Sequence, residues 1–141
     1  MIDYKNKKIL LAHWDSENKK DNVSQNWYTP LKKIFGEVIT FSPKKNYFIY
    51  GKKVMNQKFI EIIEREKPEV IFFMLIYDEF DPGVFAEIRR KFPKTKMISF
   101  NSDDSWRFYD FYRYYSLFFD YILSASIQAI PFYKKEKMSK V

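Results

Sequence analysis

Polar side chains that could do chemistry follow three short apolar runs: ILLA, VIFFMLI and MISF. They are His13 and Trp14 after the first run, Tyr77, Asp78 and Glu79 after the second, and Asn101, Ser102, Asp103, Asp104 and Trp106 after the third. If the runs are strands of one parallel sheet, their carboxyl ends meet at one edge, where sheets of this kind bind ligands. With a strand order of 2-1-3-4-5, the binding crevice lies between the first and third strands.

Each of these residues has a catalytic or binding interpretation and a structural one. His13 is the single histidine and the natural general base, or else a hydrogen-bonded structural residue. Trp14 stacks on a sugar ring or covers the sheet edge. Tyr77, Asp78 and Glu79 line the crevice, where the two carboxylates hold a cation or a hydroxyl-rich ligand, or else are solvated.

The block from Asn101 to Asp104, followed by Trp106, is the densest polar group. Ser and Asp side chains at this point cap the following helix, and carboxylates are favoured near its start. Capping explains one or two of the residues but does not require all four. We therefore keep a second hypothesis, in which Asn101 or Asp103 also contacts a ligand.

Several kinds of chemistry are excluded by composition. The chain has three glycines, with no G-x-G-x-x-G and no Walker loop, so a phosphate cradle of backbone amides is not expected. It has no cysteine and one histidine, which disfavours thiol and zinc chemistry. We expect no metal site and no cofactor.

A receiver domain of the phospho-aspartate kind is also disfavoured. It needs an acidic pair after the first strand, an aspartate directly at the end of the third and a lysine at the end of the fifth. Only Asp15 and Asp78 come near these places, and the sequence SAS at 124–126 replaces the lysine.

Strand-like runs alternate with helical stretches, which predicts an α/β fold: a Rossmann-like or flavodoxin-like three-layer sandwich with a parallel five-stranded sheet in the order 2-1-3-4-5. The expected strands are 9–12, 37–41, 68–76, 97–100 and 121–123. The first expected helix begins at Asn22 or Thr29 and ends before Gly36. The other expected helices cover 54–66, 82–92, the aromatic stretch after Ser105, and 128–137. Residues 47–50 are predicted to form a short edge strand.

The chain of 141 residues is predicted to be a single domain (1–141), without a transmembrane segment and cytoplasmic. Its formal charge of +7 suits a polyanion, but the lysine pairs are dispersed, which argues against nucleic acid. Aromatic residues make up 21% of the chain. Trp106, Tyr109 and Tyr114 fall outside the apolar face of their helix, so they are candidates for an exposed patch.

The order of several segments resembles the amino-terminal half of the spore-maturation (CgeB-type) glycosyltransferases, which are of the GT-B class. The segments are KKILLAHWD, LKKIFGEVITF, KPEVIFF, FNSDDSWRF and FDYILSAS. The resemblance covers nearly the whole chain. The positions that match are His13 and Trp14 after the first strand, and the block from Asn101 to Asp104 with Trp106.

This resemblance implies an acceptor-side domain of a transferase, inactive without a carboxyl-terminal nucleotide-sugar-binding domain that would follow Val141. The implied partners are that domain and a glycan or other hydroxyl-bearing acceptor. Two alternatives remain open: a non-catalytic binding module for an anionic glycan or single-stranded nucleic acid, and a flavodoxin-like interaction domain.

Overall fold

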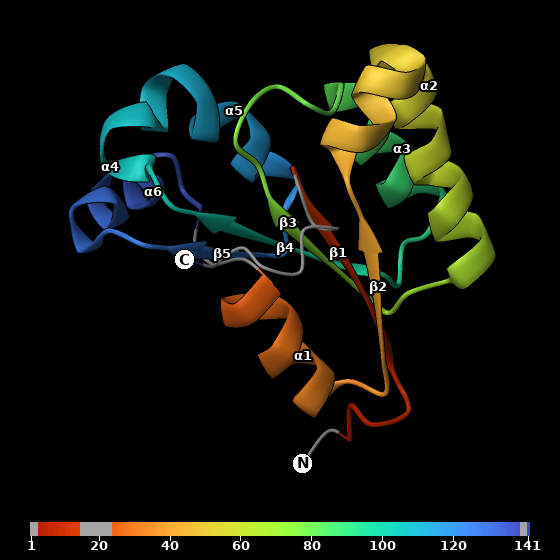
Figure 1. Cartoon of the computed structure of the whole chain (residues 1–141). Helices are drawn as coiled ribbons and strands as arrows, with labels where there is room; N and C mark the ends of the chain where they lie inside the picture. Colours follow the sequence, from red (N-terminus) through yellow and green to blue (C-terminus); the bar gives the residue numbers. More distant parts are fainter. Residues whose placement is uncertain (1–2, 15–23, 139–140) are drawn as a thin grey trace.

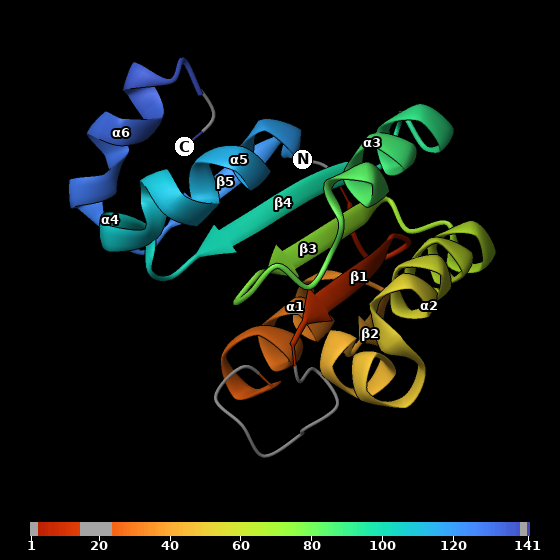
Figure 2. The same ribbon diagram turned by 90° about the horizontal axis from the view of Figure 1, so that it is seen from above.

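Five short apolar runs form one parallel sheet in this computed structural model, which describes residues 3–14, 24–138 and 141. The strands are β1 (Lys8–His13), β2 (Glu37–Phe41), β3 (Val70–Met74), β4 (Lys96–Asn101) and β5 (Tyr121–Ser124). Their order is β2-β1-β3-β4-β5, and every pair is parallel, as Figure 2 shows from above. The predicted fold class and strand order are confirmed.

Helical segments connect the strands. The longer ones are α1 (Thr29–Ile34), α2 (Pro43–Glu66), α3 (Pro82–Lys91) and α6 (Ile130–Lys135). Between β4 and β5 the chain forms α4 (Asp104–Arg107), a π-helical turn (Phe108–Tyr112), α5 (Arg113–Tyr115) and a 3-10 turn (Ser116–Phe118). A π-helical turn (Ser24–Tyr28) precedes α1, and a 3-10 turn (Ile127–Ala129) precedes α6.

The sheet has an apolar layer on each face, because successive side chains of a strand point to opposite sides. Leu10, Ile71 and Phe73 belong to the larger core under α2, α3 and the segment from α4 to α6. Ile9 and Leu11 belong to a smaller core under α1. Figure 1 shows α1 on one side of the sheet and α2 and α3 on the other. Because both faces are covered, the central strands are continuously apolar.

The predicted edge strand at 47–50 is wrong, because these residues are helical. Ser42 caps the helix by accepting the Lys45 N–H at 3.3 Å, and Pro43 occupies the first turn, where it loses no hydrogen bond. Gly51 then interrupts α2 with a φ of 79° and a ψ of 167°. The capping signals therefore outweigh the β-propensity of the aromatic run, and the kink gives α2 two parts with different surroundings.

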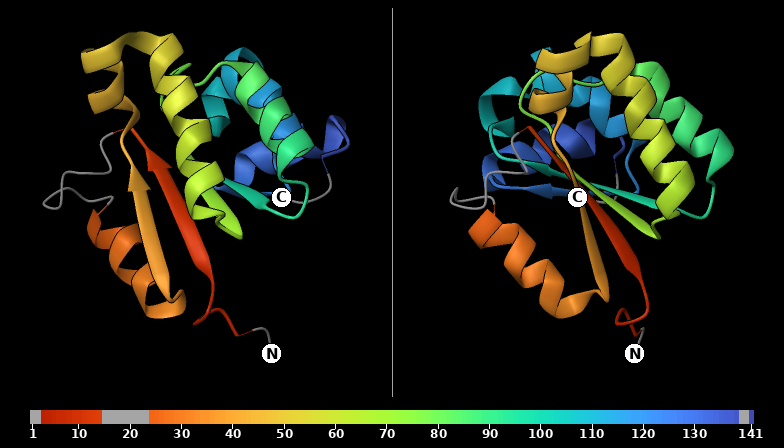
Figure 3. Two further views of the ribbon diagram at one scale, coloured as in Figure 1. Left: turned by 90° about the vertical axis from the view of Figure 1, so that its right-hand side faces the viewer. Right: turned by 45° about the vertical axis from the view of Figure 1, so that its right-hand side comes forward.

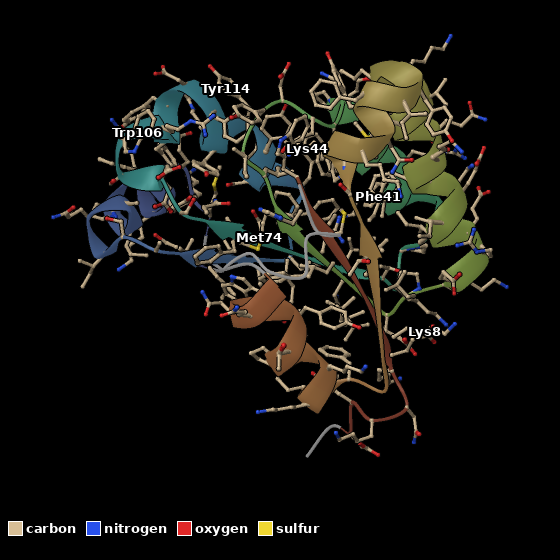
Figure 4. The ribbon with its side chains drawn as sticks, viewed as in Figure 1. Lys8, Phe41, Lys44, Met74, Trp106 and Tyr114 are labelled. Carbon is tan, nitrogen blue, oxygen red and sulfur yellow. The ribbon has the colours of Figure 1, made fainter. Side chains whose placement is uncertain are left out.

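The aromatic segment between β4 and β5 has the predicted buried face. Phe108, Phe111 and Tyr112 are buried in the larger core. Trp106 and Tyr114 are exposed, and Figure 4 labels both on the outer side of this segment. The predicted division of the aromatics is confirmed.

Candidate functional site

The carboxyl ends of the strands place the polar residues of the sequence analysis at one edge of the sheet. β1 ends at His13 and β3 ends at Met74, and these two residues are paired in the sheet. The helix that follows β1 in sequence, α1, lies on one face of the sheet, and the helix that follows β3, α3, lies on the other face (Figure 3). The adjacent ends of β1 and β3 are therefore the position where doubly wound sheets bind ligands.

An aromatic pocket with a volume of about 340 Å³ lies at these strand ends. Its lining residues come from the ends of β1 and β3 and from the first half of α2, and they are Trp14, Tyr47, Phe48, Lys52, Tyr77, Asp78 and Glu79. The Trp14 ring lies 5.5 Å from that of Tyr77, 6.2 Å from Tyr47 and 6.4 Å from Phe48, centroid to centroid. The pairs are tilted or edge-to-face, which aromatic rings prefer. Trp14 is thus the centre of the pocket.

Backbone hydrogen bonds fix Trp14 against the start of α2. Its carbonyl accepts the Lys44 N–H at 2.9 Å and the Ser42 hydroxyl at 3.1 Å. The same Ser42 hydroxyl caps α2, so one side chain joins the end of β1 to the start of the helix that carries Tyr47 and Phe48. The pocket therefore depends on the cap of α2.

Two neighbouring carboxylates have different roles at the rim. Glu79 is buried and accepts the backbone N–H groups of Ile76 at 2.9 Å and Tyr77 at 3.1 Å, which shapes the loop that presents Tyr77. Burial raises the pKa of the Glu79 carboxyl to about 7. Asp78 is exposed and forms an ion pair with Lys52 at 3.3 Å. Glu79 orders the loop, and Asp78 with Lys52 gives the pocket a charged border.

Asp81 precedes Pro82, and this Asp-Pro pair predicts that the Asp81 side chain caps α3. This prediction is wrong, because the side chain forms no capping hydrogen bond. Its carboxylate instead accepts the Asn56 side-chain N–H at 2.9 Å and pairs with Lys52 at 3.2 Å. These contacts hold the start of α3 against α2. Asp81 is a structural residue beside the pocket.

The Asn101 block is divided between the interior and the surface. Asn101 and Asp104 are fully buried in a polar network with Ser99, Ser116 and Tyr133. The Asn101 amide donates to Tyr133 OH at 2.7 Å and to Ser116 Oγ at 3.3 Å, and its oxygen accepts from Ser99. Tyr133 OH donates to Asp104 Oδ2 at 2.8 Å, while Asp104 Oδ1 has no hydrogen-bond partner among the described residues. The network joins the end of β4 to α4 and α6.

The other residues of that block lie toward the surface. Ser102 is exposed, and Asp103 precedes α4 without a side-chain capping bond. Trp106 is 72% exposed. Neither simple capping nor one shared ligand site accounts for the block. The ligand contact predicted for Asn101 or Asp103 stays a prediction.

His13 is buried at the end of β1 and does not line the aromatic pocket. By the alternation of the strand it falls on the same side as Ile9 and Leu11, under α1. Its role as a general base stays a prediction.

Sequence reasoning missed Tyr47, Phe48 and Lys52 in the pocket and Tyr133 in the network. Tyr47 and Phe48 were missed because residues 47–50 are predicted to form a strand, although the Ser42-Pro43 pair is a helix-start signal. Lys52 lies just after that stretch and is predicted as part of no element. Tyr133 lies in α6, 29 residues after its partner Asp104, and no local pattern connects them.

No group of three or more His, Cys, Asp or Glu able to hold a metal ion occurs within residues 3–14, 24–138 and 141. In the same part of the chain, no helix is long and apolar enough to cross a membrane.

No protein-family model matches the chain, and no curated protein matches its sequence. Five solved chains match its fold, among them two from response regulators. One is the selenomethionine derivative of the REC (receiver) domain of AraT, a response regulator from Geobacillus stearothermophilus, with a TM-score of 0.50 and 13% identity over 95% of this chain and 92% of that one. The other is the phosphorylated cyanobacterial phytochrome response regulator RcpA, with a TM-score of 0.51 and 16% identity over 94% of this chain and 90% of that one. At these identities the likeness concerns the fold alone, which is the flavodoxin-like fold of receiver domains.

The comparisons correct the resemblance to CgeB-type glycosyltransferases. The matching folds are those of response regulators, and the match covers nearly all of each chain. The expected acceptor-side transferase function is therefore wrong, and so are the expected partners, a nucleotide-sugar-binding domain and a glycan acceptor. The flavodoxin-like interaction domain, kept as an alternative, agrees better with these findings.

The receiver-like fold does not carry an aspartate at the end of β3. That position is occupied by Met74, labelled in Figure 4, and Asp78 lies four residues further along the chain. Asp15, the other acidic residue considered, lies outside the described residues. The fold is that of a receiver, while the side chain at this strand end is a thioether.

Proposed function

We propose that the chain is a receiver-like interaction domain that binds a partner protein at the aromatic pocket and does not accept a phosphoryl group at the end of β3. The observation that carries the proposal is that β3 ends at Met74, which is paired with His13 in the sheet, shortly before Tyr77 of the aromatic pocket. A thioether has no carboxylate with which to form an acyl phosphate. Regulation by phospho-aspartate at this strand end is therefore not expected.

The chemistry of the pocket supports a protein ligand. Four aromatic side chains supply apolar contact area, and the Lys52–Asp78 pair supplies a charged border. Such a site suits an apolar or aromatic side chain inserted from a partner segment, with polar contacts around it. We assign the direct contacts to Trp14, Tyr77 and Asp78.

The remaining residues have other places in this proposal. Asn101 and Asp104 hold the segment after β4 in position, while Ser102, Asp103 and Trp106 lie on the surface beside it. We place the domain in the cytoplasm and treat residues 1–141 as one domain.

Phosphoryl transfer is tested by incubating the chain with acetyl phosphate and Mg²⁺ and measuring its intact mass, with a phosphorylatable receiver domain as the positive control. We expect no acid-stable or acid-labile phosphoryl adduct on this chain. An adduct would contradict the proposal.

Partner binding is tested by placing a photo-crosslinking residue at Phe48, in the pocket, and at Tyr114 as the exposed aromatic control. In cells that carry the native gene, we expect a specific protein adduct at Phe48 and none of the same mass at Tyr114. The Trp14→Ala and Tyr77→Ala changes together should abolish it. An adduct that survives both changes, or no adduct at Phe48, would show that the pocket does not bind a partner.

A further inference from the structure

The first half of α2 exposes several apolar side chains that are not part of the core. Phe48 is 73% exposed and Ile49 is 57% exposed, and Tyr47, Tyr50 and Val54 are also exposed. The buried residues of the helix after Gly51 are instead Met55, Asn56, Phe59, Ile60 and Ile63. The kink thus separates a projecting apolar part from the part that packs on the sheet. Figure 1 and Figure 3 show the projecting part, in gold, at the upper end of the molecule.

The apolar side chains of this part point in all directions around the helix. Residues 47–50 are consecutive, and successive residues of an α-helix are turned by about 100°. Within residues 47–50, Tyr47 and Phe48 contact the Trp14 ring. A helix that is apolar all round is normally surrounded by apolar material, whereas a protein groove takes one stripe. A medium without a fixed shape suits this surface better than a rigid groove does.

The charge around this part is strongly positive. Residues 44–58 contain five lysines and no aspartate or glutamate. Lys52 is paired with Asp78 and Asp81, and the Lys58 ammonium lies 4.4 Å from the centre of the Tyr50 ring. Even with those two carboxylates counted, the surface stays positive, in a chain with a formal charge of +7. Its complement is an anionic surface.

We propose that the projecting part of α2, residues 43–50, together with residues 51–54 at the kink, docks on an anionic lipid bilayer. Ile49 and Tyr50 enter the boundary between headgroups and acyl chains, where tyrosine is favoured, and the lysines lie at the level of the anionic headgroups. The cytoplasmic leaflet is the anionic one, which agrees with a cytoplasmic domain. This is docking at a surface, and it needs no helix that spans the membrane.

The inference is independent of the proposed protein partner. Partner binding uses Trp14 and Tyr77 inside the pocket, whereas bilayer docking uses the outward side chains Ile49 and Tyr50. Trp14→Ala with Tyr77→Ala should remove the protein adduct and keep vesicle binding. Ile49→Ser with Tyr50→Ser should remove vesicle binding and keep the protein adduct. Each proposal can therefore fail without affecting the other.

The absence of cysteine from the chain allows a direct test. A polarity-sensitive dye is attached to Ile49→Cys and, as the control, to Ile127→Cys on the turn before α6, which is 87% exposed. Vesicles of phosphatidylcholine mixed with phosphatidylglycerol should shift the emission of the dye at position 49 to the blue and leave the dye at 127 unchanged. Vesicles of phosphatidylcholine alone should give little response, and high salt should reverse the binding.

Co-sedimentation with the same vesicles gives the energetic test. Ile49→Ser with Tyr50→Ser should weaken binding about tenfold or more because the apolar contact is lost. Lys53→Glu should weaken it several-fold, and Lys134→Glu, at the far end of the chain, should have little effect. These positions are exposed, and an unchanged urea midpoint verifies folding. Binding that is absent, equal for neutral and anionic vesicles, or insensitive to positions 49 and 50 would overturn the inference.

Discussion

Replacing Tyr133 by Phe tests the buried polar network with a single oxygen atom. The ring packs edge-to-face on Phe108 at 4.8 Å between centroids, and the substitution preserves this contact. The hydroxyl is the only group among the described residues that donates to the Asp104 carboxylate. Burial, reinforced by that carboxylate, raises the pKa of the Tyr133 phenol, so the hydroxyl keeps its proton at neutral pH.

The expected cost follows from what remains after the change. Asn101 loses one acceptor but keeps Ser116, and Ser99 still donates to it. Asp104 loses its donor and becomes a buried carboxylate without compensation. A hydrogen bond to a charged group contributes about 1.5–3 kcal/mol, and an orphaned buried charge costs more. We expect Tyr133→Phe to lower the free energy of unfolding by about 3 kcal/mol.

The second change in the test is Asp104→Asn, which removes the charge and preserves the shape. In the unaltered chain it should cost about 1 kcal/mol, since the amide oxygen can still accept from Tyr133. In the Tyr133→Phe background it should restore about 1–2 kcal/mol, because it removes the uncompensated charge. Urea titrations followed by far-ultraviolet circular dichroism give all four values. If Tyr133→Phe costs less than about 1 kcal/mol, or if Asp104→Asn has the same sign in both backgrounds, the network does not stabilise the fold in this way.

Two further predictions concern the loop after β3 and the kink of α2. The pKa of Glu79 is about 7 in the folded protein, against an ordinary value of 4.5. Between pH 4.5 and 7 the folded protein therefore binds this proton and the unfolded chain does not. Stability from this group should therefore fall by about 3 kcal/mol as the pH rises from below about 4.5 to above about 7. Glu79→Gln should not show this loss of stability. The test is to measure urea midpoints of this variant and of the unaltered chain at pH values below 4.5 and above 7. If stability changes with pH in the same way for both proteins, the prediction is wrong. Gly51→Ala should cost about 1–3 kcal/mol, because its φ of 79° strains any residue with a side chain, although no atom lies within 4 Å of the added carbon. Gly83→Ala in α3 is the matched control, because an added side chain there also meets no atom within 4 Å and its φ is not strained. Thermal melting should show that this variant is as stable as the unaltered chain or more stable by about 0.4–1 kcal/mol. Equal effects at the two glycines would refute the role of backbone strain.

The sequence by itself determined the sheet. Its signals are local patterns, namely the continuous apolar runs at β1 and β3 and the helical spacing after Val54. The interactions that such patterns reflect act between residues close in sequence. Parallel strands separated by helices admit few arrangements, so the order 2-1-3-4-5 could also be predicted. The crevice between β1 and β3 followed from that order, and Trp14, Tyr77, Asp78 and Glu79 do line it.

The resemblance of separate segments led to the wrong function. Short blocks such as KPEVIFF and FNSDDSWRF reflect strand ends and helix starts, which many α/β proteins share. The fold comparisons, which cover nearly all of the chain, point to receiver domains instead. Local blocks of this kind therefore indicate the fold class and do not identify the function.

Only the tertiary structure decided the surroundings of each polar residue. Asn101 and Ser102 are adjacent in the sequence, yet Asn101 is fully buried and Ser102 is exposed. The buried Asn101 side chain donates a hydrogen bond to Tyr133 of α6, which only the folded chain brings next to it. Likewise, Tyr47 and Phe48 reach Trp14 only because the Ser42 cap turns the chain into a helix there. Pattern and propensity act between neighbours in sequence, whereas burial and hydrogen-bond partners depend on segments that folding brings together.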